Sequence, residues 1–528
     1  MSLIKHSISF SFATLLSRVL GYVRDALIAY YFGVSHITDA FFVAFRLPNT
    51  FRGLLGEGGF NAAFVPIFAK RIKEGTEKAF LNSVFTYYTL FNLLITLLGI
   101  VFSDWIIRLI APGIAHKGYF ELTVFMARFL FSYLFFIGLS AFFMALLNTR
   151  GVFFVPAFAQ AVFNLVFALC LAFAADRIGY IALIIGVILG GLVQLLFNIP
   201  SALKKGLIPK PTFERDKDLN LLLKRLLPAI MGFGVAQLSF FIDTFLASFL
   251  ALGTISYLYY ANRIFQLPLG ALSVGMANSL LSVLSYGEDK RNNITLAFRF
   301  ITLLALPATG GLIVLSHQII ALLYGRGRFS SEDISMAGSV LSVYSLGLLF
   351  FSLQKVLSSV FFAKGDTRTP VFSSLFAVIV EGFLGFIFAF VFKLGVIGLV
   401  LGTASSSLAG FGFLLYFWKE REFNTHSYIP SLLKAFLSTL LMCLFLVAIK
   451  PNPYELFYAI PLASLIYWIS LLLLKEPLAL SVLHLLKSLV KKKQVSLYHP
   501  LQRKRLKAPF VVKRTKDQVN TQKARYQP

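Results

Sequence analysis

The chain of 528 residues is 58% hydrophobic, carries 14% charged residues and has a mean hydropathy of +0.79. Soluble domains carry about 25% charged residues, so the composition excludes an ordinary soluble protein and indicates a polytopic membrane protein. The net charge of +26 would suggest nucleic acid in a soluble chain, but here the basic residues fall mainly in short loops and the C-terminal tail. The positive-inside rule and attraction to anionic lipid explain that distribution, so we expect contact with membrane lipids and no nucleic acid.

Apolar segments of about 20 residues recur along the chain, long enough for an α-helix to span a bilayer and too long for strands of a membrane barrel. We therefore predict an all-α polytopic membrane protein with 14 transmembrane helices. They are expected near 7–33, 37–69, 79–111, 119–148, 153–175, 179–203, 219–250, 254–286, 292–324, 334–363, 370–392, 395–418, 430–449 and 455–474. Pro48 and the glycines between 53 and 59 should break the second helix at membrane depth, which is tolerated where the backbone lines a cavity.

Lysine and arginine alternate between rich and poor loops. The rich set includes the loops at 70–78, 204–217 and 290–291, whereas the loop around Gly253 has no charge. This asymmetry predicts that both termini lie in the cytoplasm, in keeping with an even number of spans. The N-terminal MSLIKHSISFSF lacks the cleavage site of a signal peptide, so we interpret it as the start of the first helix.

The basic, proline-containing segment 204–218 separates two sets of six predicted helices, 1–203 and 219–418. A shift of 217 residues lays Ala44, Arg46, Gly53 and Gly58 on Ala261, Arg263, Gly270 and Gly275. Glycines and arginines match as well as apolar residues, so chance similarity is the weaker explanation. We predict two six-helix lobes related by an axis along the membrane normal and joined by a cytoplasmic linker.

The last two predicted helices, within 430–474, stand outside the repeat. Residues 475–493 have the apolar spacing of a short amphipathic helix on the cytoplasmic face. From 494 to 528 the chain is polar and basic, and we expect disorder. Cys170 and Cys443 lie in apolar runs, so we expect buried free thiols rather than a disulfide.

Residues 17–60 concentrate charge inside two long apolar segments. Each charge at membrane depth costs about 2.5–3.5 kcal/mol, so several together should line a wet cavity rather than face lipid. The charged residues of this stretch are Arg18, Arg24, Asp25, Asp39, Arg46, Arg52 and Glu57. Arginine binds phosphate with a planar fork and stays charged when partly buried, so we predict that Arg18, Arg24 and Arg52 face an anionic ligand. Arg128, in the fourth predicted helix, is a weaker candidate.

The alternative is that these arginines form structural ion pairs with Asp25, Asp39 and Glu57, or that Arg46 and Arg52 extend to the membrane surface. Arg46 is itself predicted to serve in gating or in an ion pair. The second half contributes Arg263, in SYLYYANRIFQLP, which is the repeat-mate of Arg46. Cations from both halves suit an anionic ligand held between them. We expect Asp39, near the outer end of its helix, to act as a gate partner.

Asp243 and Glu381 are carboxylates inside apolar runs, with no basic neighbour in sequence. A buried carboxylate takes up a proton or binds a cation, and Thr403 could add an oxygen of the kind that hard cations prefer. These three residues could therefore form a Na⁺ site or couple transport to H⁺. The alternative is a protonated, hydrogen-bonded acid with no coupling role. The sequence contains no P-loop, metal-spaced histidine pair or Ser-His-Asp arrangement, so we expect a transporter rather than an enzyme, without a resident cofactor.

Five motifs resemble one family. SRVLGYVRDALIAYYFG and TDAFFVAFRLPNTFRGLLGEGGFNAAFVPIF are similar to the start of the MurJ (MviN) lipid II flippases. ISYLYYANRIFQLPLGALSVG resembles their eighth helix, and LLNTRGVFFVPAFAQAVFN and AKGDTRTPV resemble two of their helix junctions. The resemblance runs from about residue 1 to 475 and includes charged and glycine positions.

The resemblance implies the fold of the multidrug/oligosaccharidyl-lipid/polysaccharide exporter superfamily, with two lobes around a central cavity and a groove for the undecaprenyl tail at the last two helices. The implied substrate is lipid II, the peptidoglycan precursor, moved from the inner to the outer leaflet of the bacterial inner membrane without covalent chemistry. Proteins of cell-wall synthesis and cell shape would be its partners. The family's essential residues fall on Arg18, Arg24, Arg52, Arg263 and Asp39, and the matching motifs also contain Ser17, Asn49 and Glu57.

Three other functions stay open at this point. One is a flippase for another undecaprenyl-linked oligosaccharide. Another is a cation-coupled multidrug exporter of the same superfamily, which would need an anionic cavity where the sequence predicts a cationic one. The third is a scaffold for cell-wall enzymes, which would tolerate loss of the arginines.

Overall fold

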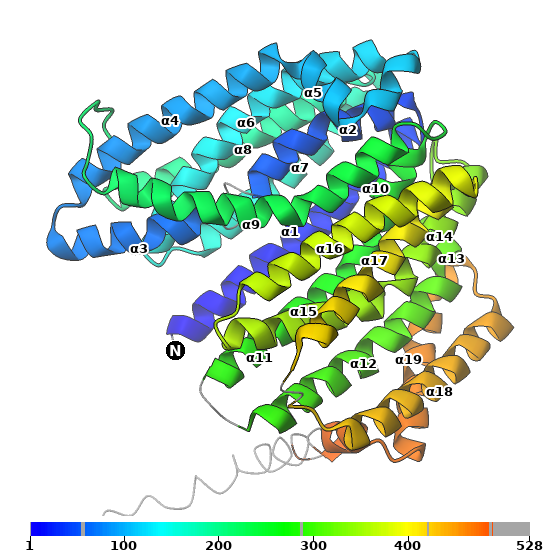
Figure 1. The fold of residues 1–528 in the computed structure, drawn as a ribbon. Helices are drawn as coiled ribbons and strands as arrows, with labels where there is room; N and C mark the ends of the chain where they lie inside the picture. Colours follow the sequence, from blue (N-terminus) through cyan, green and yellow to red (C-terminus); the bar gives the residue numbers. More distant parts are fainter. Residues whose placement is uncertain (1, 54–58, 286–288, 420–421, 485–487, 489–528) are drawn as a thin grey trace, which may run out of the picture. The chain divides into compact units, whose positions relative to one another are not determined.

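The computed structural model describes every residue except 1, 54–58, 286–288, 420–421, 485–487 and 489–528 (Figure 1). All secondary-structure elements among the described residues are helices. The predicted all-α class is therefore confirmed. The fold is described below for Met1–Ser470, which forms one compact unit, and separately for Leu471–Pro528.

The first half of the chain begins with one long helix and ends at the predicted linker. Its elements are α1 Ser2–Phe32, α2 His36–Arg52, α3 Gly59–Glu74, α4 Glu77–Val101, α5 Ser103–Ile110, the 3-10 turn Pro112–His116, α6 Phe120–Thr149, α7 Phe154–Ile178 and α8 Ile181–Lys204.

The second half repeats the pattern of long helices with short breaks. Its elements are α9 Leu219–Ala247, α10 Thr254–Pro268, the π-helical turn Leu269–Val274, α11 Gly275–Ser285, α12 Lys290–Val314, α13 Ser316–Tyr324, α14 Ser331–Leu346, α15 Leu348–Ala363, α16 Arg368–Phe386, the π-helical turn Ile387–Val391 and α17 Gly395–Phe417. Two more helices follow, α18 Thr425–Ile449 and α19 Leu456–Leu473.

Each of the 14 predicted segments is helical in its described part, but the longest ones are divided. The segment predicted at 334–363, for example, is α14 and α15, which are bent by 40° at Gly347. Among the described residues, 10 helices are long and apolar enough to cross a membrane, or 11 if this bent pair is one span. The chain is therefore a multi-pass membrane protein, and the count of 14 spans stays a prediction.

The second predicted helix, 37–69, is divided into α2 and α3 as predicted, but Pro48 itself does not end α2. α2 continues through Pro48 and ends at Arg52, and α3 begins at Gly59. Membrane helices tolerate proline because neighbouring groups satisfy the carbonyl that the proline leaves free. Gly56 and Gly58, two of the glycines in this prediction, lie outside the described residues.

Helices of the first half pack chiefly against one another: α1 lies against α7, and α6 lies against α2, α4 and α8. In the second half α16 packs along α17, and α10 packs against α14 (Figure 1). Small residues allow these close approaches, as is usual between membrane helices. A Cβ on Gly402 of α17 would lie 2.5 Å from the Gly385 backbone of α16. α9 contacts α3 as well as α16, so it touches helices of both halves.

The predicted linker is held against the first half. Arg71 of α3, whose side chain is 7% exposed, contacts Asp216 at 2.6 Å and Asp218 at 2.8 Å. Asn82 and Thr86 of α4 accept hydrogen bonds from linker backbone amides. The linker therefore follows the surface of α3 and α4.

α18 packs along α12, and Ser438 of α18 bonds to Ser470 of α19 at 2.9 Å. Tyr467 donates to the carbonyl of Leu303 in α12 at 2.6 Å, which fixes α19 in the same unit. In Leu471–Pro528, residues 477–484 form a described helical stretch of the predicted amphipathic helix. Most of the rest of the predicted amphipathic helix lies outside the described residues. The whole of the predicted disordered tail, 494–528, also lies outside them.

Candidate functional site

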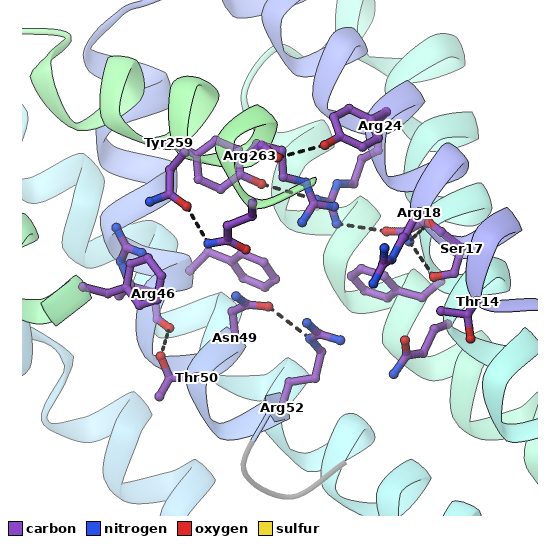
Figure 2. Close-up of a pocket in the computed structure, with 18 of the residues that line it drawn as sticks. Thr14, Ser17, Arg18, Arg24, Arg46, Asn49, Thr50, Arg52, Tyr259 and Arg263 are labelled. Atoms are coloured by element: carbon purple, nitrogen blue, oxygen red, sulfur yellow. Dashed lines mark hydrogen bonds between the residues drawn. The ribbon is translucent and has the colours of Figure 1, made fainter. Parts of the chain in front are cut away.

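A cavity of about 720 Å³ lies among helices from both halves of the chain (Figure 2). Its lining includes five arginines: Arg18, Arg24, Arg46, Arg52 and Arg263. All four arginines that the sequence predicted as ligand residues are therefore in one cavity. Arg46, predicted as a gating or ion-pair residue, is the fifth.

Helical periodicity explains why these side chains meet. On α1, Arg18, Tyr22 and Asp25 follow at i, i+4 and i+7, so they share one face. Arg46 and Asn49 of α2 stand three residues apart, and Arg52 follows after three more. Residues at such spacings are neighbours on a helix surface, so each helix presents a polar stripe to the cavity.

Asp25 binds two of the arginines. The carboxylate is fully buried and accepts hydrogen bonds from Arg24 Nε at 2.9 Å and Arg24 Nη2 at 2.6 Å. Its other oxygen lies 2.9 Å from Arg263 Nε, and Tyr259 donates its hydroxyl to Asp25 at 3.2 Å. Asp25 thus joins α1 of the first half to α10 of the second. Arg24 thus forms an ion pair with Asp25, as the alternative predicted, and Arg263 forms a second one.

Arg24 is fixed from a further side. Its Nη1 donates to Asn164 Oδ1 of α7 at 3.0 Å, and Asn164 in turn donates to the carbonyl of Ser17 at 3.0 Å. Arg263 is also oriented, because its carbonyl accepts from the hydroxyl of Tyr22 at 2.8 Å. Figure 2 shows Arg24 and Arg263 next to each other on one side of the cavity.

The remaining three arginines have different contacts. Arg52 donates from Nε to Asn49 Oδ1 at 3.1 Å. Arg18 is exposed to the cavity, and no ion pair within 4.0 Å is found for it among the described residues. Arg46 stacks over the ring of Phe240 at 5.5 Å. With Asp25 and the lining residue Asp243 both ionised, the five arginines leave a formal charge of +3, which favours an anionic occupant.

Among the described residues, no arginine lies within ion-pair distance of Asp39. It is 1% exposed and caps the start of α10, where its carboxylate accepts from Gly253 N at 2.7 Å, Ser256 N at 2.9 Å and Ser256 Oγ at 2.6 Å. An anion at a helix N-terminus is stabilised by the unpaired N–H groups and the helix dipole. The predicted gate residue therefore joins the two halves.

Further contacts between the halves gather near this capping contact. Arg328 N donates to the carbonyl of Tyr30 at 2.8 Å, and Gly113 N donates to Ser248 Oγ at 3.0 Å. A Cβ on Gly33 would lie 2.3 Å from the Arg328 carbonyl oxygen, so glycine is required at this approach. Lys117 donates to the carbonyl of Leu250, and burial lowers the pKa of Lys117 while Asp39 opposes that change. Hydrogen bonds to backbone amides and carbonyls therefore join the two halves of the chain near Asp39.

The predicted ion-site residues lie together. Asp243 is 5% exposed and Glu381 2% exposed, their carboxylates interact electrostatically, and Ser239 and Thr403 lie next to Glu381. Asp243 Oδ1 and Glu381 Oε1 are buried without a hydrogen-bond partner. This all-oxygen set is compatible with a small hard cation or a shared proton. Within the described part of the chain, no three His, Cys, Asp or Glu residues form a metal cluster.

Some predicted residues fall elsewhere. Glu57 lies outside the described residues. Arg128 is not among the residues that line this cavity and donates to Ser103 Oγ at 3.3 Å. The two cysteines are free, as predicted, but only partly buried.

Sequence reasoning missed a set of side-chain amides. Those that line the cavity, besides the predicted Asn49, are Asn61, Asn148, Gln160, Asn164, Gln194, Gln237, Asn262 and Gln266. The sequence does contain a pattern that indicates them: Gln160 with Asn164, and Asn262 with Gln266, are i,i+4 pairs inside apolar helices. Amides offer both donors and acceptors, so the cavity can bind neutral polar groups beside its cationic centre.

Comparisons with known proteins agree on one family. The profile described as "Lipid II flippase MurJ" matches residues 28–461. The "Probable lipid II flippase MurJ" of Aquifex aeolicus is 38% identical over 484 residues, covering 91% of this chain and 96% of the relative. The "Lipid II flippase MurJ" of Burkholderia cenocepacia is 33% identical over 405 residues, covering 74% and 78%.

A solved structure titled "Lipid II flippase MurJ, inward closed conformation" superposes with a TM-score of 0.78 at 31% identity, covering 88% of this chain and 98% of that one. A structure titled as the inward-facing conformation of a multidrug resistance MATE family transporter of the MOP superfamily has a TM-score of 0.64 at 17% identity, which shows a shared fold alone. The charged cavity, the helical fold and these matches lead to one conclusion: the chain belongs to the lipid II flippase MurJ family.

Proposed function

We propose that this chain is a lipid flippase that moves lipid II from the cytoplasmic to the outer leaflet of the bacterial inner membrane. The observation that carries the proposal is the cavity in which arginines from α1, α2 and α10 surround one space with a formal surplus of positive charge. The headgroup of lipid II is joined to its tail through a pyrophosphate, and guanidinium groups bind phosphate oxygens in pairs.

The arginines and the amides that line the cavity would have different roles in binding. Arg18 of α1 and Arg52 of α2 both line the cavity, so they would bind the pyrophosphate. Arg24 and Arg263 are shared with Asp25 and would hold the two halves around the bound anion. The amides would bind the sugars and peptide, which carry hydroxyl and amide groups. No bond of the substrate is made or broken.

Transport would proceed by alternating access. The contacts at Asp39 would form the outer closure, with both termini in the cytoplasm and residues 1–203 and 219–418 acting as the two lobes. Neutralisation of the arginines by the headgroup would let the lobes approach on the cytoplasmic side, so that the outer contacts can part. The tail would stay in the bilayer against α18 and α19; α18 exposes Leu433, Phe436, Leu440 and Leu444.

A cation gradient or the membrane potential would supply the driving force. Asp243, Glu381 and Thr403 would hold the coupling ion, Na⁺ or H⁺, because they bring unpaired buried oxygens together next to the cavity. A bound ion would supply positive charge that offsets the two carboxylates. Cell-wall synthesis proteins are expected partners.

The proposal is tested by flipping of lipid II in liposomes that contain the full chain, with Arg18→Gln and Arg52→Gln. Each variant should lower the rate about a hundredfold, the equivalent of losing one or two charged hydrogen bonds. Arg108→Gln is the matched control, because Arg108 forms an exposed i,i+4 pair with Asp104 away from the cavity. Unchanged flipping in both cavity variants, or no flipping by the unmodified chain, would contradict the proposal.

The same liposomes separate the alternatives. An oligosaccharide flippase would transport an undecaprenyl-linked oligosaccharide unit in preference to lipid II. A multidrug exporter would transport organic cations, which the surplus positive charge disfavours. A scaffold would flip neither lipid.

A further inference from the structure

Two arginine–aspartate pairs cross between the halves of the chain in a repeated pattern. Arg263 lies 217 positions after Arg46, and Asp243 lies 218 positions after Asp25. Arg263 of α10 contacts Asp25 of α1, with 2.9 Å between Nε and Oδ2. Arg46 of α2 has its strongest attractive electrostatic interaction with Asp243 of α9. In each half, therefore, the arginine of the second helix is directed to the aspartate of the other half's first helix.

The two arginine–aspartate pairs differ in the distance between their charged groups. Asp25 and Arg263 form a contact ion pair, and Arg24 and Tyr259 complete the bonds of that carboxylate. Among the ion pairs of the described residues, none within 4.0 Å joins Arg46 to Asp243. Arg46 Nε is buried without a hydrogen-bond partner, and so is Asp243 Oδ1. This second pair is attracted but not bonded.

Arg46 is also placed to reach the cavity. It lines the cavity together with Asn49 and Arg52 of the same helix. Its guanidinium stacks on Phe240, which belongs to α9 and stands three residues before Asp243. Stacking holds the plane of a guanidinium while leaving its N–H groups free to bind oxygens at the edge. Figure 2 shows Arg46 on the side of the cavity opposite Arg18.

A carboxylate and a phosphate compete for the same fork of a guanidinium, since both offer paired oxygens. Asp243 is the carboxylate that lines the cavity beside Arg46, while Glu381 and Tyr344 face it from α16 and α14. We infer that Arg46 is an exchangeable cation, held toward Asp243 when the cavity contains no anion and transferred to the phosphates of the headgroup when they enter. The inference rests on the proposed function. Through Arg46, binding of the headgroup would change the charge environment of Asp243 in the second half.

The exchange makes an unusual prediction, because the two members of the pair should have opposite effects on binding. Asp243→Asn removes the competitor, so the full chain in nanodiscs should bind lipid II about three- to tenfold more tightly. Arg46→Gln removes the cation, so binding should weaken about tenfold or more. The double variant should bind lipid II as Arg46→Gln alone does, because Asp243 affects headgroup binding through its competition for Arg46.

A longer carboxylate gives an independent test. Asp243→Glu extends the side chain by one methylene toward Arg46, which should form the missing contact and weaken lipid II binding about threefold or more. It keeps the inference testable if Asp243→Asn does not fold, as judged by thermal unfolding in detergent. Asp104→Asn is the matched control, because Asp104 pairs with Arg108 outside the cavity, and it should leave binding unchanged.

The outcomes separate the two proposals. If the unmodified chain binds lipid II but Asp243→Asn weakens binding as Arg46→Gln does, the pair is structural and the exchange is refuted while the proposed function stands. Equal binding by all variants refutes the exchange as well. If the unmodified chain does not bind lipid II, the proposed function fails and the exchange fails with it.

Discussion

Replacing Asp39 by asparagine should loosen the contact between α2 and α10. Asp39 Oδ1 accepts from both the amide and the hydroxyl of Ser256, while Oδ2 accepts from Gly253 N at 2.7 Å. The oxygen of an asparagine can keep both bonds from Ser256. Its NH₂ group then faces the Gly253 N–H, and a donor meets a donor.

The size of the effect follows from these contacts. A buried N–H without an acceptor costs about 1–3 kcal/mol. Loss of a negative charge at a helix N-terminus adds about 0.3–1 kcal/mol. Burying a neutral amide costs less than burying a carboxylate, which offsets part of this loss. We therefore expect the contact to weaken by about 2 kcal/mol, which multiplies its open population about thirtyfold.

A cysteine at Val34 can report the opening. Val34 packs against Gly253, where a Cβ would lie 2.5 Å from Val34 Cγ1. With Cys170 and Cys443 replaced by serine, maleimide labelling of Val34→Cys should be about thirtyfold faster in Asp39→Asn than in its parent. A change below about threefold would refute the argument.

Asp289→Asn is the control for this experiment. Asp289 also caps a helix with its carboxylate, but it does so at the start of its own helix α12, at an exposed site. Its substitution should leave labelling at Val34→Cys unchanged. An equal increase in this variant would show that labelling follows general destabilisation rather than the α2–α10 contact.

Three further predictions follow from contacts away from the cavity. Gly138→Ala should destabilise the chain by about 1–3 kcal/mol in thermal unfolding, because the new Cβ would lie 2.3 Å from the side chain of Asn92 in α4. Gly311→Ala is the control: no neighbouring atom among the described residues lies within 4 Å of its Cβ position, so it should stabilise the chain by about 0.5–1 kcal/mol. Arg71→Met should free the linker and accelerate limited proteolysis between 207 and 218, because it leaves two carboxylates unpaired; proteolysis at the unmodified rate would show that the linker is held by other contacts. Hydrogen bonds from Thr369 lower the pKa of Asp366, so ionised Asp366 stabilises the turn before α16, and hydrogen-exchange protection at Thr369 should be flat above about pH 4 and fall below it. A protection factor that falls already near neutral pH would contradict this assignment.

The positions of the helices and the identity of the charged residues were determined by the sequence alone. Apolar runs of membrane length form helices wherever they occur, because an unpaired backbone in lipid costs too much. Charge at membrane depth has a similar cost, so Arg18, Arg24, Arg52 and Arg263 had to face an interior space. The i,i+4 spacing of Gln160 and Asn164 within an apolar helix carries the same information for the amides.

The tertiary structure decided which charges meet. Helical spacing places Asp25 on a face of α1, but only packing of α10 against the first half could show that it binds both Arg24 and Arg263. Asp39 caps a helix that begins more than two hundred residues later, and Asp243 finds Arg46 at a similar separation. Local sequence patterns cannot predict these partners, because ion pairs and helix caps depend on distances of a few ångströms that are fixed only when the helices pack.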